Sequence, residues 1–239
     1  PTSLDASARA SDRGCEVASR GYPRSLTYSK VCSNIAGMNQ LATVRSLQQR
    51  ITSMQPARLD RGLPTPPSLR PLFPGGALRK GAPVAVQGSL QLSLALLSSA
   101  SASGAWCGVI GVPHLGIGAA AQTGLALERL VLIPEPGKHA LAIAGMLSEV
   151  LTVLVLNPER PPSAGEAERL NARLRDHGTA LVVTHAWPRS DTALRVTASR
   201  WSGLGTGNGL LCTHELSVQS TDKRGQRTHT VRFRDGQLT

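Results

Sequence analysis

Residues 83–111 read PVAVQGSLQLSLALLSSASASGAWCGVIG, and this stretch indicates the fold class. The apolar run PVAVQ has the length of a buried strand, and Gly88 closes it with a turn. Ser89 is a favourable N-cap for the helix expected over the following apolar residues, which ends near Gly104. WCGVIG is a second short apolar run. The stretch therefore predicts a strand, a helix and a second strand, the unit from which parallel sheets are built.

The same alternation continues downstream, after a short helix expected at 119–122. Expected strands and helices follow one another over residues 127–134, 137–148, 151–157, 163–177 and 180–185. The strand segments are apolar throughout, which is typical of strands buried on both faces. The pattern predicts a parallel sheet covered by helices.

The C-terminal segments have a different pattern. Residues 193–201, 210–220 and 228–234 alternate apolar and polar side chains, as antiparallel strands with one wet face do. The turn DKRGQ at 222–226 predicts a hairpin between the last two. We therefore expect an α/β fold, with a mostly parallel sheet flanked by helices and an antiparallel C-terminal extension.

Four segments divide the chain. Residues 1–37 lack periodicity and are expected to be a disordered leader. Residues 38–55 are expected to form an N-terminal amphipathic helix, and residues 56–81 a Pro-rich connector that either wraps over the domain or links the helix to it. The folded domain is expected over residues 82–239.

The chain is basic, with a formal net charge of +11 and a pI near 10.7. Such a charge attracts phosphates and makes nucleic acid a candidate partner, although heavy arginine usage gives the same charge without any ligand. No apolar run approaches the roughly 18 residues that cross a bilayer, so no membrane role is expected. The four cysteines are widely spaced, which argues against a metal site and a disulfide framework. A cytoplasmic location is expected.

Over residues 70–235 the order of these segments resembles the core of RecA-type recombinases. LFPGGALRKGAPVAVQGS (72–89) is similar to the family's opening motif, strand and phosphate loop. GLALERLVLIPEPGKHALAIAGML (124–147) resembles a further conserved stretch of that core, and LTVLVLNPE (151–159) resembles its Walker B strand. The resemblance implies a RecA-like core.

The residues that hydrolyse nucleotide in this family are missing. A working phosphate loop needs G-x-x-x-x-G-K-[ST], whereas the strand runs directly into Gly88 and Ser89 without a lysine. The Walker B strand ends at Asn157 instead of the aspartate that holds Mg²⁺. The loop at 111–114, which resembles the one that carries the catalytic glutamate, reads GVPH. We therefore expect a degenerate nucleotide pocket with no enzymatic activity, cofactor or metal.

Within the RecA-like proteins the chain resembles the actinobacterial ImuA family, in the form called ImuA-prime. The segments that carry this resemblance are RGLPTPPSLRPLFPGG (61–76), GAWCGVIGVP (104–113) and ASRWSGLGTGNGLLCTHELSVQS (198–220). The resemblance implies a non-catalytic accessory protein of translesion DNA synthesis in the SOS response and damage-induced mutagenesis. Its implied partners are ImuB, an inactive Y-family polymerase homologue, and an error-prone replicative-type polymerase, with a nucleoid-associated location in the cytoplasm.

Two further functions remain open from the sequence. One is a DNA-stimulated ATPase of the RecA type with an unorthodox pocket, and the other is a regulator that mimics a recombinase protomer.

Two groups of residues are candidates for binding. Lys223, Arg224, Arg227, Arg232 and Arg234 concentrate in the expected C-terminal hairpin and are candidate contacts to DNA phosphates, single-stranded DNA included. Leu41, Val44, Leu47 and Ile51 form the apolar face of the N-terminal helix, a candidate surface for a partner or for homo-oligomers.

Overall fold

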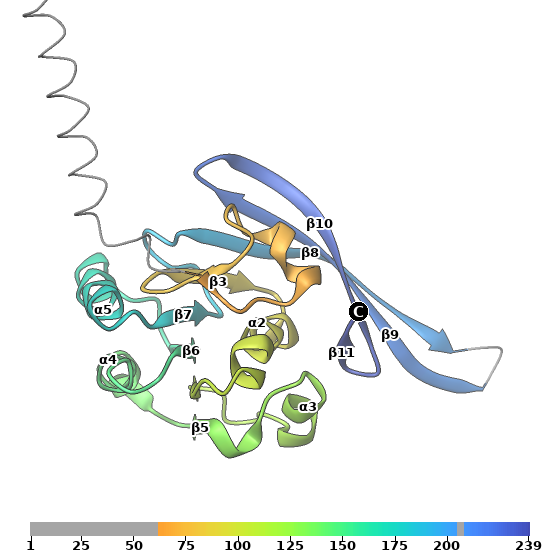
Figure 1. The fold of residues 1–239 in the computed structure, drawn as a ribbon, viewed down its shortest axis with the longest axis horizontal. Helices are drawn as coiled ribbons and strands as arrows, with labels where there is room; N and C mark the ends of the chain where they lie inside the picture. Colours follow the sequence, from red (N-terminus) through yellow and green to blue (C-terminus); the bar gives the residue numbers. More distant parts are fainter. Residues whose placement is uncertain (1–61, 205–207) are drawn as a thin grey trace, which may run out of the picture. The chain divides into compact units, whose positions relative to one another are not determined.

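The computed structural model describes residues 62–204 and 208–239, and a nine-stranded sheet runs through this part of the chain (Figure 1). The strand order is β11-β10-β9-β8-β3-β7-β6-β4-β5. Neighbouring strands from β8 to β5 are parallel, and β8 to β11 are antiparallel. The parallel strands are β3 (Pro83–Gln87), β4 (Cys107–Ile110), β5 (Leu130–Ile133), β6 (Val153–Leu156), β7 (Ala180–Val183) and β8 (Thr192–Leu204). The antiparallel extension adds β9 (Gly209–Asp222), β10 (Gly225–Arg234) and β11 (Gln237–Leu238).

The mixed α/β architecture predicted from the sequence, a mostly parallel sheet with an antiparallel C-terminal extension, is therefore confirmed. The hairpin turn expected at 222–226 is also present, because Gly225 of β10 pairs with Asp222 of β9.

Helices cover both faces of the parallel strands. They are α2 (Leu90–Ala102), α3 (Ile117–Gln122), α4 (Ala140–Leu147) and α5 (Ala164–His177), with short 3-10 turns η2 (Leu127–Arg129) and η3 (Gly137–His139). Two separate apolar cores result, one with α2 and α3 and one with α4 and α5.

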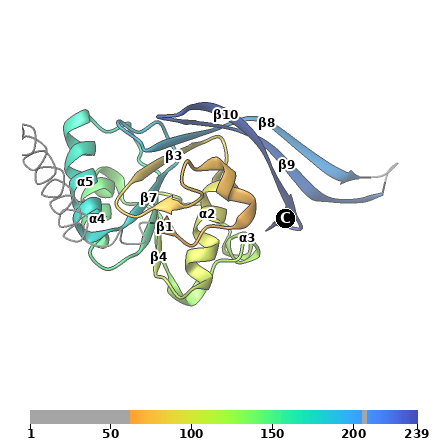
Figure 2. The same cartoon turned by 45° about the horizontal axis from the view of Figure 1, so that its top comes forward.

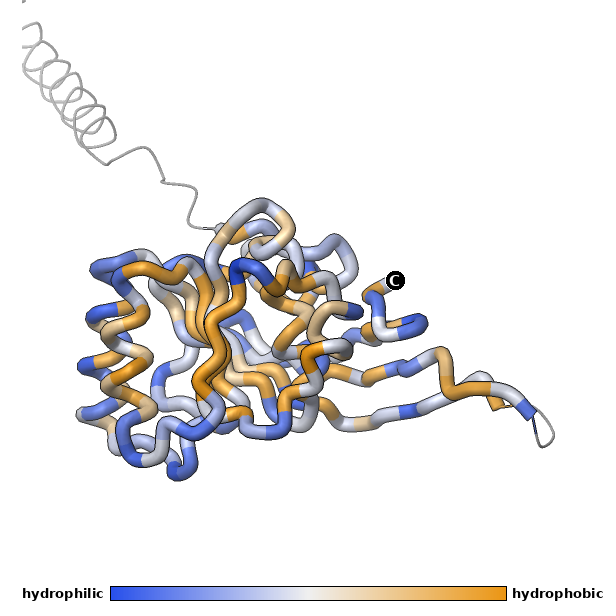
Figure 3. Tube along the Cα trace, turned by 90° about the horizontal axis from the view of Figure 1, so that it is seen from below, coloured by the Kyte–Doolittle hydropathy of each residue, from blue (hydrophilic) through white to orange (hydrophobic). Residues whose placement is uncertain are grey.

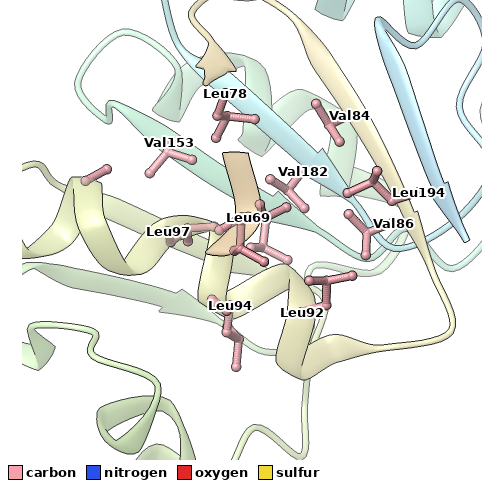
Figure 4. Close-up of a cluster of buried hydrophobic side chains, with 14 of the residues drawn as sticks. Leu69, Leu78, Val84, Val86, Leu92, Leu94, Leu97, Val153, Val182 and Leu194 are labelled. Carbon is pink, nitrogen blue, oxygen red and sulfur yellow. The ribbon is translucent and has the colours of Figure 1, made fainter. Parts of the chain in front are cut away.

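Alternation along each buried strand supplies both cores. In β3, Val84 and Val86 pack in the core that contains α2, whereas Ala85 packs in the core that contains α5. In Figure 4, Val86 lies beside Leu92 of α2, and Val84 lies further along β3. Successive strand side chains point to opposite faces, so a strand buried on both faces has to be apolar throughout.

The Pro-rich segment takes part in the fold from residue 62 onward. It contains β1 (Gly62–Leu63), η1 (Pro67–Leu72) and β2 (Leu78–Arg79), and β1 pairs with β2. Leu69 and Leu78 are fully buried in the same core as α2 (Figure 4). Of the two arrangements expected for this segment, the described part wraps over the domain. The folded domain therefore begins earlier than residue 82, because Leu63, Leu69 and Leu78 belong to its core.

Strands β8 and β9 extend past the other strands as a two-stranded ribbon (Figure 1, Figure 2). β3 pairs with β8 only as far as Arg195, and β10 pairs with β9 only as far as Thr213. β8 and β9 remain paired to Leu204 and Gly209, so the end of the ribbon is two-stranded. The tube coloured by hydropathy shows apolar residues in the inner strands and again near the end of the ribbon (Figure 3).

The predicted leader 1–37 and the predicted helix 38–55, with Leu41, Val44, Leu47 and Ile51, lie outside the described residues. Among the residues that are described, no helix combines the length and apolar character needed to cross a membrane.

The packing of the Pro-rich segment gives a first testable prediction. Leu69→Ala should lower the free energy of unfolding by about 2–5 kcal/mol, because it leaves a cavity in the core. Leu96→Ala in α2, at an equally buried position, should cost a similar amount. Leu210→Ala, at a position 82% exposed, serves as the neutral control. Urea unfolding measures all three, and a Leu69→Ala protein as stable as the control would show that the segment is only a linker.

Candidate functional site

Only Gly88 and Ser89 separate the end of β3 from the start of α2. The Ser89 hydroxyl accepts a hydrogen bond from the backbone N–H of Leu92 at 3.1 Å, so it caps the helix as predicted. A phosphate loop at this position places several residues between strand and helix, and their N–H groups surround the phosphates. The two-residue connection leaves no length for such a loop.

Gly88 also lies against the neighbouring strand. Its φ is +93°, in the left-handed region that favours glycine, and a Cβ at this position would lie 3.2 Å from Cβ of Val196 in β8. The turn is therefore tightly packed on the side of β8.

Asn157 follows β6 and joins three strand ends. Its Nδ2 donates to the carbonyl oxygen of Gly111 at 2.7 Å, and its Oδ1 accepts from the Thr184 hydroxyl at 2.5 Å. Its backbone N–H donates to the carbonyl of Ile110 at 2.9 Å. The amide thus uses both a donor and an acceptor to connect the carboxyl ends of β4, β6 and β7. An aspartate could not make both bonds, because an ionised carboxylate only accepts.

Gly111 opens the loop that was expected to replace the one carrying the catalytic glutamate. Its φ is +80°, and a Cβ there would overlap the backbone carbonyl of Asn157. Its N–H donates to Ile133 at 2.8 Å. The loop after β4 is therefore held against the ends of its neighbouring strands β5 and β6.

The structure places Gly88, Ser89 and Asn157 at the carboxyl edge of the parallel sheet, where open α/β sheets bind ligands. β7 lies between the strands that carry them. The hydrogen bonds of the Ser89 and Asn157 side chains go to the backbone of α2 and to the neighbouring strand ends, respectively. Among the described residues, no group of three or more His, Cys, Asp or Glu side chains is placed to hold a metal ion.

The five candidate phosphate contacts do not form one strip. Lys223 and Arg224 lie at the β9–β10 turn, where Arg224 donates to the carbonyl of Pro74 at 2.8 Å. Arg227 forms an ion pair with Asp222 at 2.5 Å. These three cations are at one end of the hairpin, and two of them have partners within the protein.

Arg232 and Arg234 lie further along β10 on the outer face, opposite the buried Val231 and Phe233, as their spacing predicted. Arg232 forms an ion pair with Glu215 of β9 at 2.7 Å, which reduces its availability to a phosphate.

Strand register adds two arginines that sequence reasoning missed. Arg200 lies directly opposite Glu215, so it shares the outer face with Arg232. Arg195 pairs with Gln219, which lies on the same face as Glu215. The outer arginine face, defined as Arg195, Arg200, Arg232 and Arg234, is exposed. Arg195 and Arg200 are five residues apart, so a regular strand would place them on opposite faces. The irregularity of β8 between Val196 and Ala198 brings both to the same face, which the sequence does not indicate.

A second missed feature is a cavity of about 530 Å³ between α2, α3 and the ribbon, named the ribbon cavity. Its walls are mostly apolar and include Leu94 of α2, Ala119 of α3, and Trp201, Leu211 and Phe233 of the antiparallel strands.

His214 fixes one wall of the ribbon cavity. Its ring stacks on Trp201 with centroids 3.9 Å apart and planes 7° from parallel. Nδ1 lies 2.7 Å from Oε1 of Gln91, and Nε2 lies 2.9 Å from the Ser199 hydroxyl. Burial lowers the pKa of the imidazole, which favours the neutral ring. A neutral ring can donate from Nδ1 to Gln91 and accept at Nε2 from Ser199, so both nitrogens are satisfied.

The role of Asn157 gives the second prediction. Asn157→Asp should lower the free energy of unfolding by about 1–3 kcal/mol, because the Gly111 carbonyl loses its donor and faces a negative charge. The exposed Asn208→Asp is the matched control and should have little effect. Chemical denaturation at neutral pH compares the two. Unchanged stability of N157D, or Mg²⁺-dependent ATP hydrolysis gained by it, would contradict a structural role.

Comparisons with known proteins relate the parallel part of the sheet to a described family. Residues 71–189 match the family described as MT3502 N-terminal domain, which is just under half of the chain. The match includes Gly88, Ser89 and Asn157 and ends before β8.

The chain is also similar to the uncharacterized protein Rv3395c of Mycobacterium tuberculosis, with 32% identity over 127 residues. The alignment spans 52% of this chain and 62% of the relative, which is less than two thirds of the relative's own length. Both similarities concern proteins whose descriptions state no activity.

Proposed function

We propose that the chain is a non-catalytic, RecA-like accessory protein of an error-prone translesion DNA synthesis complex. It acts by binding an inactive Y-family polymerase homologue of the ImuB type and, through it, an error-prone replicative-type polymerase. The observation that carries the proposal is the closed carboxyl edge of the sheet at Gly88, Ser89 and Asn157.

The arrangement of strands supports the RecA-like part of the proposal. β3, the turn and α2 form a strand, turn and helix in the order of a phosphate-binding unit. β6, whose sequence resembles a Walker B strand, lies in the same parallel sheet, with β7 between it and β3. The residues that resemble nucleotide-binding motifs therefore come from one edge of one sheet.

The chemistry at this edge supports the non-catalytic part. Phosphoryl transfer needs positioned phosphates, a cation and a metal held by a carboxylate. Ser89 uses its hydroxyl as a helix cap, and Asn157 is a neutral amide committed to Gly111 and Thr184. Losing the loop, the lysine and the metal ligand together removes separate contributions to the rate, so a single compensating residue would not restore it.

Binding to DNA is a subsidiary part of the proposal, for which the outer arginine face is the best support. Four exposed arginines share this face, with Glu215 between Arg200 and Arg232. Such a surface would contact phosphates irrespective of base sequence and would weaken with salt. Contact with DNA would be in keeping with the proposed nucleoid-associated location in the cytoplasm.

The similarity to a protein of Mycobacterium tuberculosis supports the actinobacterial side of the resemblance. It adds nothing on partners, because that relative is uncharacterized.

The proposal is tested by deleting the gene in its host and measuring ultraviolet-induced mutation frequency. In the deletion strain, we expect the mutation frequency after ultraviolet irradiation to fall to that of undamaged cells. Expression of the wild-type chain in that strain should restore it. In parallel, the purified full chain should co-elute with the ImuB-type protein in gel filtration, with or without ATP. Normal induced mutagenesis in the deletion strain, together with no co-elution, would refute the proposed function.

A further inference from the structure

The outer half of β8 has a free strand edge. β8 pairs with β3 only over residues 192–195. Beyond an irregularity at Thr197, it pairs from Ala198 to Ser202 with β9 alone. Within the described part of the chain, no strand lies along its other side. A free edge presents backbone N–H and C=O groups in the spacing that an added strand can satisfy.

The same part of β8 contributes to the ribbon cavity. Trp201 lies in this stretch, lines the cavity and is 51% exposed. Leu204, Leu210 and Leu211 are exposed nearby on the ribbon. Exposed apolar side chains gathered beside a cavity are typical of a binding surface.

Contacts within the protein order the cavity wall. The stack of Trp201 on His214 and the hydrogen bonds of His214 to Gln91 and Ser199 hold the aromatic side chains in one arrangement. A ligand would therefore bind to a preformed wall and would lose less conformational entropy on binding.

Charge at the cavity disfavours anions as ligands. Asp235 is the charged side chain among its lining residues, and no Lys or Arg of the described residues 62–204 and 208–239 lines it. Asp235 and Gly236, both with positive φ, form the turn between β10 and β11, so the backbone fixes the position of this carboxylate. A nucleic-acid phosphate or a lipid phosphate would meet apolar walls and a negative charge, whereas a Lys or Arg side chain would meet an opposite charge.

We propose that the ribbon cavity and the free edge of β8 together bind an extended segment of a partner protein. The segment adds a strand along residues 198–202 and places a bulky apolar side chain in the cavity, with a neighbouring Lys or Arg near Asp235. The edge requires a polypeptide, the walls require an apolar side chain, and the carboxylate selects a basic neighbour. The inference rests on the proposed function, because it locates one protein-binding surface of the accessory protein.

The test is selection of binders from a phage library of random twelve-residue peptides on the purified full chain. Enriched peptides should share a bulky apolar residue within two positions of Lys or Arg, and their synthetic forms should be measured by fluorescence anisotropy. In Trp201→Ser and Ala119→Trp the Kd should rise about tenfold or more, which is the size expected for a central contact. Ala119→Trp fills the cavity from an exposed position on α3, so it tests the site even if Trp201→Ser disturbs folding.

Matched controls separate the site from general effects. Trp106→Ser changes a tryptophan that is 49% exposed elsewhere on the protein and should leave the Kd unchanged. Asp235→Asn removes the charge and keeps a residue that tolerates positive φ. It should therefore raise the Kd of peptides that contain Lys or Arg and leave that of uncharged peptides unchanged.

Hydrogen exchange locates the peptide independently of affinity. Bound peptide should protect backbone amides of residues 198–202. The proposal is overturned if no peptide is enriched, if the enriched peptides are acidic, if neither cavity variant changes the Kd, or if protection appears at the β5 edge, Leu130–Ile133, instead. Peptide binding needs no lesion, polymerase or living cell. The peptide experiment can therefore fail while the deletion strain still shows reduced mutagenesis, and peptides can bind while the deletion strain shows normal mutagenesis.

Discussion

Gly88 and Ser89 bridge the end of β3 and the start of α2 in two residues, with Val196 of β8 packed against Gly88. This short connection fixes α2 against the sheet and brings its first turn beneath the antiparallel strands, where Gln91 meets His214. The same short connection leaves no length for a phosphate loop at the carboxyl edge of the sheet. It also positions α2 so that this helix forms one wall of the ribbon cavity. A longer, glycine-rich loop at this point would need the space that the present packing uses.

The strands of the antiparallel extension have an apolar face toward the core and a basic face toward solvent. Alternation places Leu216, Val218, Val231 and Phe233 in the core and turns the outer arginines to solvent. Just beyond the end of β3, Leu216 and Val218 of β9 still pack in the core. Further along the ribbon, Trp201 of β8 and Leu211 of β9 line the ribbon cavity. The same strands thus offer a basic face and an apolar cavity, each suited to a different kind of partner.

The parallel part of the fold could be predicted because its strands are short, apolar runs with turn residues after them. The same local signals gave the Ser89 cap and the position of Asn157 at a strand end. What could not be predicted depends on contacts distant in sequence. The Pro-rich segment contains Leu69 and Leu78 at no regular period, so its packing beside α2 had no local signal. Gln91 and His214 are 123 residues apart, and Arg200 joins Arg232 only through strand register.

We propose that the carboxyl edge of the parallel sheet at Gly88, Ser89 and Asn157 neither binds nor hydrolyses ATP. Titration calorimetry of the full chain with Mg²⁺-ATP tests this, followed by phosphate release with and without single-stranded oligo-dT. We expect no heat of binding at millimolar ATP and no phosphate release above buffer in either condition. Saturable binding with DNA-stimulated phosphate release would contradict it, and would require a cation and a metal ligand from outside the set Gly88, Ser89 and Asn157.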